Sequence, residues 1–151
     1  MSTGLHLCST TQEMKIRLLM LGKTRREECR TLFDDYASRI RRYASLEVTE
    51  LRDPRKIKLD SSTTLVLLDA AGKQFTSQQF AKWLSDLKDR GTRELAFLCG
   101  DAEGFPTELR TKAVQKISLS TLTMPHELAR VLLAEQIYRA FAILAGHPYP
   151  K

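Results

Sequence analysis

The stretch Thr64-Leu65-Val66-Leu67-Leu68-Asp69 decides the fold class of this 151-residue chain. The run from Leu65 to Leu68 contains no polar residue, so a strand formed there is covered on both faces by other elements. Strands of this kind are typical of parallel sheets, whose connecting helices pack against the two faces. The stretch therefore predicts an α/β protein.

The segments on both sides alternate between strand and helix patterns. Thr76 and Gln79 form a capping box that begins a helix after this strand, and Gly91 ends the helix. The alternation predicts a mainly parallel sheet with helices on both faces. Further strands are predicted over 16–21, 46–51, 95–99 and 116–119, and further helices over the amphipathic segment from Leu32 to Tyr43 and over 106–114 and 125–145.

Length and composition fit one soluble domain, since a domain takes roughly 100–200 residues. We expect this domain to span residues 14–151, because residues 1–13 are polar and unpatterned and indicate a disordered extension or a misassigned start codon. The chain is 42% hydrophobic and 28% charged, which excludes fibrous and wholly disordered classes.

The cysteines and the apolar runs bear on the compartment. Cys8, Cys29 and Cys99 form no C-x-x-C pair, so neither a disulfide framework nor a zinc site is expected. The longest apolar run, residues 140–145, is far shorter than the ~20 residues that span a bilayer, and the N-terminus lacks a signal-peptide pattern. These features predict a cytoplasmic protein without a membrane segment.

Three segments at the carboxyl ends of predicted strands are candidates for a ligand site. In open parallel sheets, ligands bind at this edge. The segments 69–72, 100–104 and 118–124 combine glycines, hydroxyl groups and apolar residues, which suits a ligand with polar ends and an apolar middle. The alternative is that Asp69, Gly100 and Gly104 only form turns. Dinucleotide and phosphate-loop glycine motifs are absent from the sequence, as are nucleophile-elbow and H-x-x-x-H patterns.

The predicted last helix is apolar around most of its circumference. Leu128, Leu133 and Tyr138 point in different directions on a helical wheel, which favours packing against both its own sheet and a partner subunit. A buried helix of a monomer is the alternative. The charged residues Glu127, Arg130, Glu135 and Arg139 have spacings that suit ion pairs within the helix or across a subunit interface.

Three blocks together resemble the RlmH family, formerly YbeA. The blocks are Leu65–Asp69 with Gly72-Lys73, Phe97–Gly100 with Gly104, and the long block from Ser118 to Phe141. This family comprises pseudouridine N3-methyltransferases of large-subunit ribosomal RNA in the SPOUT class, and the resemblance covers residues 14–151. It implies a C-terminal trefoil knot, a homodimer, S-adenosylmethionine as methyl donor without a metal, and 23S rRNA in the large subunit or the assembled ribosome as substrate.

The resemblance also implies a set of site residues. Arg130 and Tyr149, in the last helix and the tail, are the catalytic candidates, and Lys23, Arg25 and Arg26 are candidates for binding rRNA phosphates. The implied cofactor-binding residues are Leu68, Gly100, Leu119, Ser120, Thr121, Leu122, Thr123 and Met124.

The sequence departs from the family pattern at three places. Pro150 stands where the family has a histidine, and proline can neither shuttle a proton nor donate a hydrogen bond. Asp101 stands where a glycine is usual. The connection Arg52–Thr63 is short for a parallel crossover, which predicts a thin layer, altered rRNA docking or an exposed apolar patch. A catalytically impaired ribosome- or cofactor-binding homologue is therefore the second hypothesis, and a generic nucleotide-binding α/β domain is the third.

Overall fold

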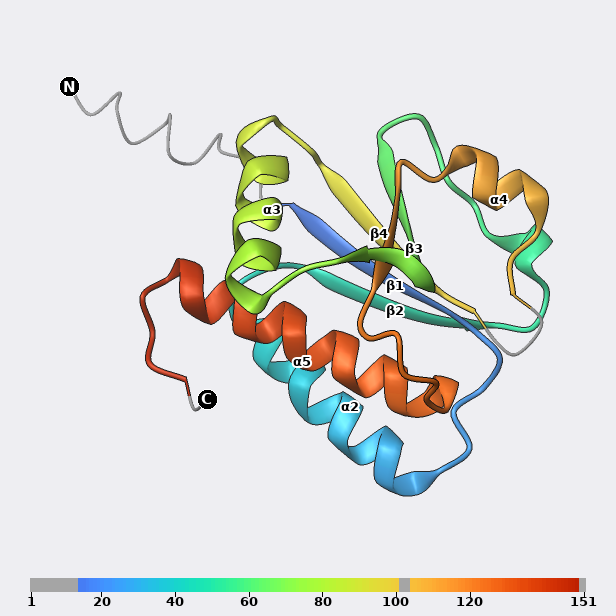
Figure 1. Cartoon of the computed structure of the whole chain (residues 1–151), viewed down its shortest axis with the longest axis horizontal. Helices are drawn as coiled ribbons and strands as arrows, with labels where there is room; N and C mark the ends of the chain where they lie inside the picture. The colour runs from blue at the N-terminus through green and yellow to red at the C-terminus, as the bar shows by residue number, and fades with distance from the viewer. Residues whose placement is uncertain (1–13, 101–103, 150–151) are drawn as a thin grey trace.

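The structure, a computed structural model, contains one five-stranded sheet in the order β2-β1-β4-β3-β5 (Figure 1). It describes residues 14–100 and 104–149, so the expectations for residues 1–13, Asp101 and Pro150 lie outside the described residues. Every pair of neighbouring strands is parallel, which confirms the predicted sheet. The strands are β1 (Lys15–Leu21), β2 (Leu46–Leu51), β3 (Thr63–Gln74), β4 (Glu94–Cys99) and β5 (Gln115–Ser118).

The helices are distributed unequally over the two faces of the sheet. On one face, α2 and α5 lie side by side and α3 meets α5 through a 2.9 Å hydrogen bond from Ser77 Oγ to Gln136 Oε1 (Figure 1). The other face is covered by α4, a short 3-10 helix η1 and the chain around them. The elements are α2 (Glu27–Ile40), η1 (Pro54–Lys56), α3 (Ser77–Asp89), α4 (Thr107–Lys112) and α5 (His126–Leu144).

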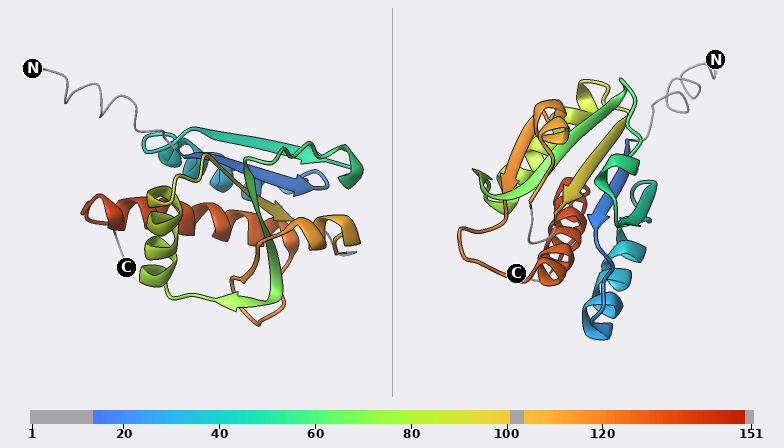
Figure 2. Two further views of the ribbon diagram at one scale, coloured as in Figure 1. Left: turned by 90° about the horizontal axis from the view of Figure 1, so that it is seen from above. Right: turned by 90° about the vertical axis from the view of Figure 1, so that its right-hand side faces the viewer.

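The face covered by α2, α3 and α5, which we call the thick face, holds the larger core. Ile16, Leu18 and Phe97 project from β1 and β4 into the space under the helices and are fully buried there. Helix α5 runs along this face (Figure 2) and buries residues on several sides, which agrees with its near-continuous apolar sequence. The predicted capping box at α3 is present, with Gln79 N donating to Thr76 Oγ1 and Thr76 N donating to Gln79 Oε1.

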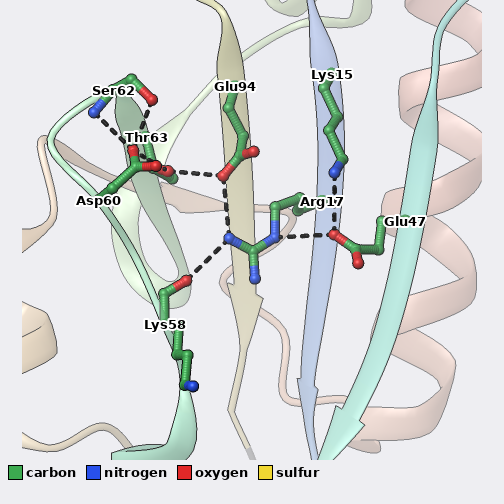
Figure 3. Close-up of polar contacts among 8 residues, drawn as sticks. All are labelled: Lys15, Arg17, Glu47, Lys58, Asp60, Ser62, Thr63 and Glu94. Carbon is green, nitrogen blue, oxygen red and sulfur yellow. Dashed lines mark hydrogen bonds and ion pairs between the residues drawn. The ribbon is translucent and has the colours of Figure 1, made fainter.

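The face covered by α4 and η1, which we call the thin face, combines a small apolar core with an ionic network. Toward the carboxyl ends of the strands, Leu19, Leu67 and Leu98 are buried under residues of the short crossover and α4. At the amino ends, Arg17 donates to Lys58 O at 3.1 Å and to Glu94 Oε2 at 3.0 Å (Figure 3).

Arg17 Nε also lies 3.3 Å from Glu47 Oε1, and Glu94 Oε2 accepts a 2.6 Å hydrogen bond from Thr63 Oγ1 (Figure 3). This network takes the place of the exposed apolar patch expected beside the short crossover. The crossover leaves edge strand β2 and passes β1 and β4 to reach β3, and the bond from Arg17 to Lys58 fastens it halfway.

Strand β3 is longer than predicted and corrects the interpretation of residues 69–72 as a loop. The strand continues to Gln74, and both Leu68 and Lys73 pair with Ile117 of β5, so the residues between them form a bulge. A Cβ atom on Gly72 would lie 2.6 Å from the Lys116 carbonyl carbon, so only glycine permits this approach of the strands. The sequence hides the extension because the residues after Leu68 are mostly exposed and carry no apolar pattern.

Two helix details also differ from the predictions. Leu32, expected in the buried stripe of α2, is 48% exposed, whereas the neighbouring Phe33 and Ala37 are buried. Pro125 is the N-cap of α5 rather than a residue of its first turn. The knot implied by the resemblance stays a prediction.

Candidate functional site

A cavity of about 260 Å³ lies beside the bulge of β3 and the carboxyl end of β4, beneath the segment that joins β5 to α5. It brings together residues from all three segments singled out by the sequence. Seven of the eight residues implied for cofactor binding line it, and Thr121 lies in the same segment without lining it. The lining comprises Leu68, Asp69, Ala70, Cys99, Gly100, Leu119, Ser120, Leu122, Thr123, Met124, His126 and Ala129.

The segment over this cavity is held by its own hydroxyl groups. Ser118 Oγ donates to Ser120 O at 3.0 Å, and Ser120 Oγ accepts a 2.9 Å hydrogen bond from Leu122 N. Leu122 is 76% exposed, a large apolar side chain at the rim of the cavity. The segment thus offers a fixed backbone together with an uncovered apolar side chain.

The part of the cavity wall formed by Cys99 and Gly100 contains no reactive group. Burial raises the pKa of Cys99 to about 12, despite the opposing charge of Arg130, so the thiol stays protonated at neutral pH and is no nucleophile. At Gly100 a Cβ atom would lie 2.9 Å from the Phe105 ring, which explains the glycine by side-chain packing. Both residues therefore shape a binding wall and supply no reactive group.

Arg130, one of the catalytic candidates, is buried and holds the end of β1. Its guanidinium donates to Leu21 O at 2.7 Å, to Gly22 O at 3.0 Å and to Thr24 Oγ1 at 2.8 Å. It also lies 3.8 Å from a carboxylate oxygen of Glu50. These contacts give Arg130 a structural role, and its side chain does not line the cavity. Its catalytic role stays a prediction.

Tyr149, the other catalytic candidate, packs against the C-terminal half of α5. Its hydroxyl donates to Glu135 Oε2 at 3.0 Å, and its ring meets the Tyr138 ring edge-on at 4.8 Å. Burial and the neighbouring Glu135 carboxylate raise the pKa of Tyr149 well above its ordinary value. The phenol therefore stays protonated at neutral pH and acts as a hydrogen-bond donor. The structure does not bring Tyr149 to the cavity wall within one protomer.

Sequence reasoning missed the roles of two residues at or near this site. Cys99 lines the cavity, and Glu127 Oε1 and Oε2 accept hydrogen bonds from the backbone N–H groups of Arg26 and Arg25. His126, for which the sequence left a ligand contact and a structural role open, also lines the cavity. The charge of Glu127 suggested an ion pair, but its partners are backbone groups, which carry no sequence signal.

Residues 14–100 and 104–149 contain neither a candidate metal site nor a candidate membrane span. No group of three or more histidine, cysteine, aspartate or glutamate residues there has the proximity that a metal ion requires. No helix in these ranges is both long and apolar enough to cross a membrane.

Comparison with known families shows the family to which the chain belongs. A family model described as a predicted SPOUT methyltransferase matches residues 14–150. The chain belongs to the SPOUT methyltransferase family. This membership confirms the class implied by the resemblance, and it makes this SPOUT methyltransferase an enzyme of methyl transfer.

Relatives of this SPOUT methyltransferase match it over nearly their whole length. Ribosomal RNA large subunit methyltransferase H of Geobacter sulfurreducens is 43% identical, over 90% of this chain and 99% of the relative. The protein of the same name from Gloeobacter violaceus is 40% identical, over 90% of this chain and 98% of the relative.

Solved structures share the fold at low identity. A probable methylase family protein from Haemophilus influenzae has a TM-score of 0.54 at 11% identity, covering 94% of this chain and 73% of that chain. The SpoU methyltransferase AviRb from Streptomyces viridochromogenes has a TM-score of 0.53 at 13% identity, covering 90% of this chain and 62% of that chain.

Proposed function

We propose that this SPOUT methyltransferase transfers a methyl group from S-adenosylmethionine to N3 of a pseudouridine in 23S rRNA, acting on the large subunit or the assembled ribosome. One observation carries the proposal: residues far apart in sequence, implied in advance for cofactor binding, surround one cavity. The rRNA substrate is supported by the names of the relatives, which match over almost their full length.

The lining of the cavity suits the proposed cofactor. Leu68, Leu119 and Met124 supply an apolar wall for a flat aromatic ring, and the backbone of the segment over the cavity is fixed for hydrogen bonding to ring nitrogens. The sulfonium supplies an already activated methyl group, so the protein needs no metal and no covalent intermediate. What remains for the chain is in-line positioning of the two reactants and exclusion of water.

The acceptor nitrogen must lose its proton before it attacks. Within one protomer the Tyr149 hydroxyl donates to Glu135 and lies away from the cavity, so we propose that in the homodimer it serves the cavity of the other protomer. There it orients the base and, since the phenol stays protonated, accepts no proton. The positive charge of Arg130 acts electrostatically at Cys99 in the cavity wall. We propose that this charge favours the deprotonated ring of the pseudouridine.

We propose that the enzyme is a homodimer of the cytoplasm. The dimer rests on the exposed apolar residues of α5, where Leu128, Leu132 and Ile143 are 41%, 37% and 38% exposed. They recur at helical spacing along one side of a helix whose other sides are buried, which is the arrangement of an interface helix. In sedimentation experiments, we expect the Leu132→Glu variant to be a monomer and the wild type to be a dimer.

Calorimetry with S-adenosylmethionine, followed by methyl incorporation into ribosomes from a strain that lacks the endogenous enzyme, tests the function. Binding together with incorporation is expected. Binding without incorporation supports the catalytically impaired homologue, the second candidate, which the sequence favours through Pro150. A folded protein that does not bind the cofactor contradicts the assignment.

Tyr149→Phe tests the proposed role of the tail. We expect kcat to fall at least tenfold while the dissociation constant for S-adenosylmethionine stays unchanged, because the hydroxyl acts on the base. Tyr43→Phe is the matched control, since Tyr43 stacks on Phe141 through its ring. Equal kcat values for Tyr149→Phe and wild type exclude the role.

A further inference from the structure

A second, open cleft of about 930 Å³ lies at the carboxyl ends of β1 and β2. Its charged lining is mostly basic: Lys23, Arg25, Arg30 and Arg52 outnumber Glu27 and Glu50. We call this the basic cleft. It is far larger than one phosphate group needs, and its cations come from three places in the chain, namely the β1–α2 loop, α2 and the end of β2.

One of the two acids in the basic cleft, Glu50, is already paired within the protein. Glu50 Oε2 accepts a 2.9 Å hydrogen bond from Thr24 N and lies 3.6 Å from Arg30 and 3.8 Å from Arg130. The outer cations have no comparable partner: within the described ranges, no hydrogen bond or ion pair involves the side chains of Lys23, Arg25 or Arg52. The basic cleft therefore presents a net positive charge at its mouth.

The loop that carries these cations has a fixed backbone. Arg25 N and Arg26 N donate to the Glu127 carboxylate at 3.1 and 2.9 Å, and the Arg130 guanidinium holds the carbonyls of Leu21 and Gly22. A loop held at both ends in this way keeps its cations in place before a ligand arrives, which lowers the entropic cost of binding.

The first turn of α5 contacts both the cavity described above and the loop of the basic cleft. His126 and Ala129 line the cavity, whereas Glu127 and Arg130 hold the loop of the basic cleft. The strands that end at the two sites, β1 and β4, are direct neighbours in the sheet. A ligand in the basic cleft is thus placed next to a ligand in the cavity.

We propose that the basic cleft binds the phosphate backbone of the rRNA that flanks the target base, and that Glu127 is a positioning residue that orients the cleft toward the cofactor. This inference rests on the proposed function. Several fixed, unpaired cations along an open cleft match a polyanion, since each neutralised phosphate releases counterions. Because positions 23, 25 and 52 reach phosphates only, they contribute affinity without sequence specificity.

The salt dependence of binding to purified large subunits tests the basic cleft without requiring methyl transfer. The double variant Arg25→Gln/Arg52→Gln is expected to bind at least tenfold more weakly at low salt. The slope of log affinity against log salt should fall by about 1.5 for two lost phosphate contacts. The matched control is Lys88→Gln/Arg93→Gln, which removes the same charge at the amino edge of the sheet and should leave the slope unchanged.

Glu127→Ala tests the positioning role. We expect KM for ribosomal substrate to rise about fivefold while kcat and the affinity for S-adenosylmethionine are unchanged. Glu127→Gln keeps one acceptor oxygen for the loop, so its KM should lie close to the wild-type value. A thermal midpoint within a few degrees of wild type shows that each variant is folded.

The outcomes separate the two proposals. Methylation by the wild type, together with unchanged binding of the Arg25/Arg52 variant, overturns the basic cleft and leaves the function standing. Weakened binding of that variant without methylation by the wild type supports the cleft and contradicts the function. If the Lys88/Arg93 control loses as much affinity for large subunits, the effect comes from net charge alone, which contradicts a specific site in the basic cleft.

Discussion

The two ends of the sheet use their charged residues in opposite ways. At the amino ends, Arg17, Glu47 and Glu94 are joined to one another and to the crossover (Figure 3). At the carboxyl ends, the terminal nitrogens of Arg130 donate to backbone carbonyls and to Thr24, and the side chains of the outer cations of the basic cleft have no partner in the part of the chain that the structure describes. Charges that pair with each other stabilise the fold, whereas fixed and unpaired charges are available to a ligand.

This difference predicts that amino-end variants change stability and leave binding unchanged. Variants of the outer cations should do the reverse. Arg130 is the exception, because it belongs to the carboxyl end and is also buried. The four substitutions below test the comparison in order of their expected effect on the free energy of unfolding.

Arg130→Met should have the largest effect, a loss of about 3 kcal/mol. The substitution leaves the Leu21 and Gly22 carbonyls without their buried donor and removes the positive charge 3.8 Å from the Glu50 carboxylate. Urea unfolding measures the loss, and Arg130→Lys, which keeps the charge but not the fork of donors, should lose less. If the charge of Arg130 also favours the deprotonated base, the folded Arg130→Lys variant, which keeps that charge, should reach its maximal rate at the same pH as wild type. A loss below about 1 kcal/mol for Arg130→Met would contradict its structural role.

Gly72→Ala should cost about 2 kcal/mol through overpacking. The new methyl group would meet the Lys116 backbone at 2.6 Å, so β3 and β5 must move apart. Because β3 and the segment that follows β5 line the cofactor cavity, calorimetry should also show weaker binding of S-adenosylmethionine. Gly91→Ala, which meets nothing within 4 Å but has a φ of +85°, controls for backbone strain alone. Equal losses in the two variants would rule out the contact with β5.

Glu94→Gln should cost about 1 kcal/mol at pH 7 and leave binding to ribosomes unchanged. Burial raises the pKa of Glu94, but hydrogen bonds from Thr63 and Arg17 outweigh burial and hold it below its ordinary value. A carboxyl group with a lowered pKa in the folded state stabilises the protein above its unfolded pKa of 4.5, and this stability is lost as the pH falls through the folded pKa. The difference between variant and wild type should therefore shrink in urea titrations at acidic pH. A constant difference across the pH range would exclude the ionic contribution.

Lys82→Ala should have the smallest effect, within about 0.5 kcal/mol. Lys82 and Asp86 form an ion pair one turn apart on α3, but their side chains are 78% and 51% exposed. The substitution measures how much a paired but solvent-exposed charge contributes to the free energy of unfolding, for comparison with the half-buried network of Arg17. Thermal unfolding at low and high salt should give nearly the same midpoint shift. A loss as large as that of Glu94→Gln would remove the distinction between the network and an ordinary surface pair.

Much of the fold was accessible from local sequence patterns. The apolar run 65–68, the capping box of Thr76 and the long helix after Pro125 each depend on neighbouring residues, and the structure contains all three elements. The continuation of β3 was not accessible, because the bulge that permits it depends on contact between Gly72 and Lys116, which are far apart in the chain.

The candidate site divides in the same way. The segments that line the cavity were identifiable because glycines and hydroxyl groups follow apolar strands, and parallel strands bring their carboxyl ends to one edge. The positions of Arg130 and Glu127 were not identifiable, since both bind backbone groups of a loop about 100 residues earlier in the chain. Backbone groups are the same at every residue, so no side-chain pattern marks their partners.

The sequence by itself determined the α/β class, the order of its elements, the segments that form the cavity and the resemblance that family membership confirms. These features follow from hydrophobic periodicity and turn chemistry, which act over a few residues. Only the tertiary structure decided which charges are satisfied and which are free. That distinction depends on distances between residues remote in the chain: Arg17 reaches the crossover and Glu94, and Glu127 holds the loop that leaves Arg25 without a side-chain partner in the described ranges.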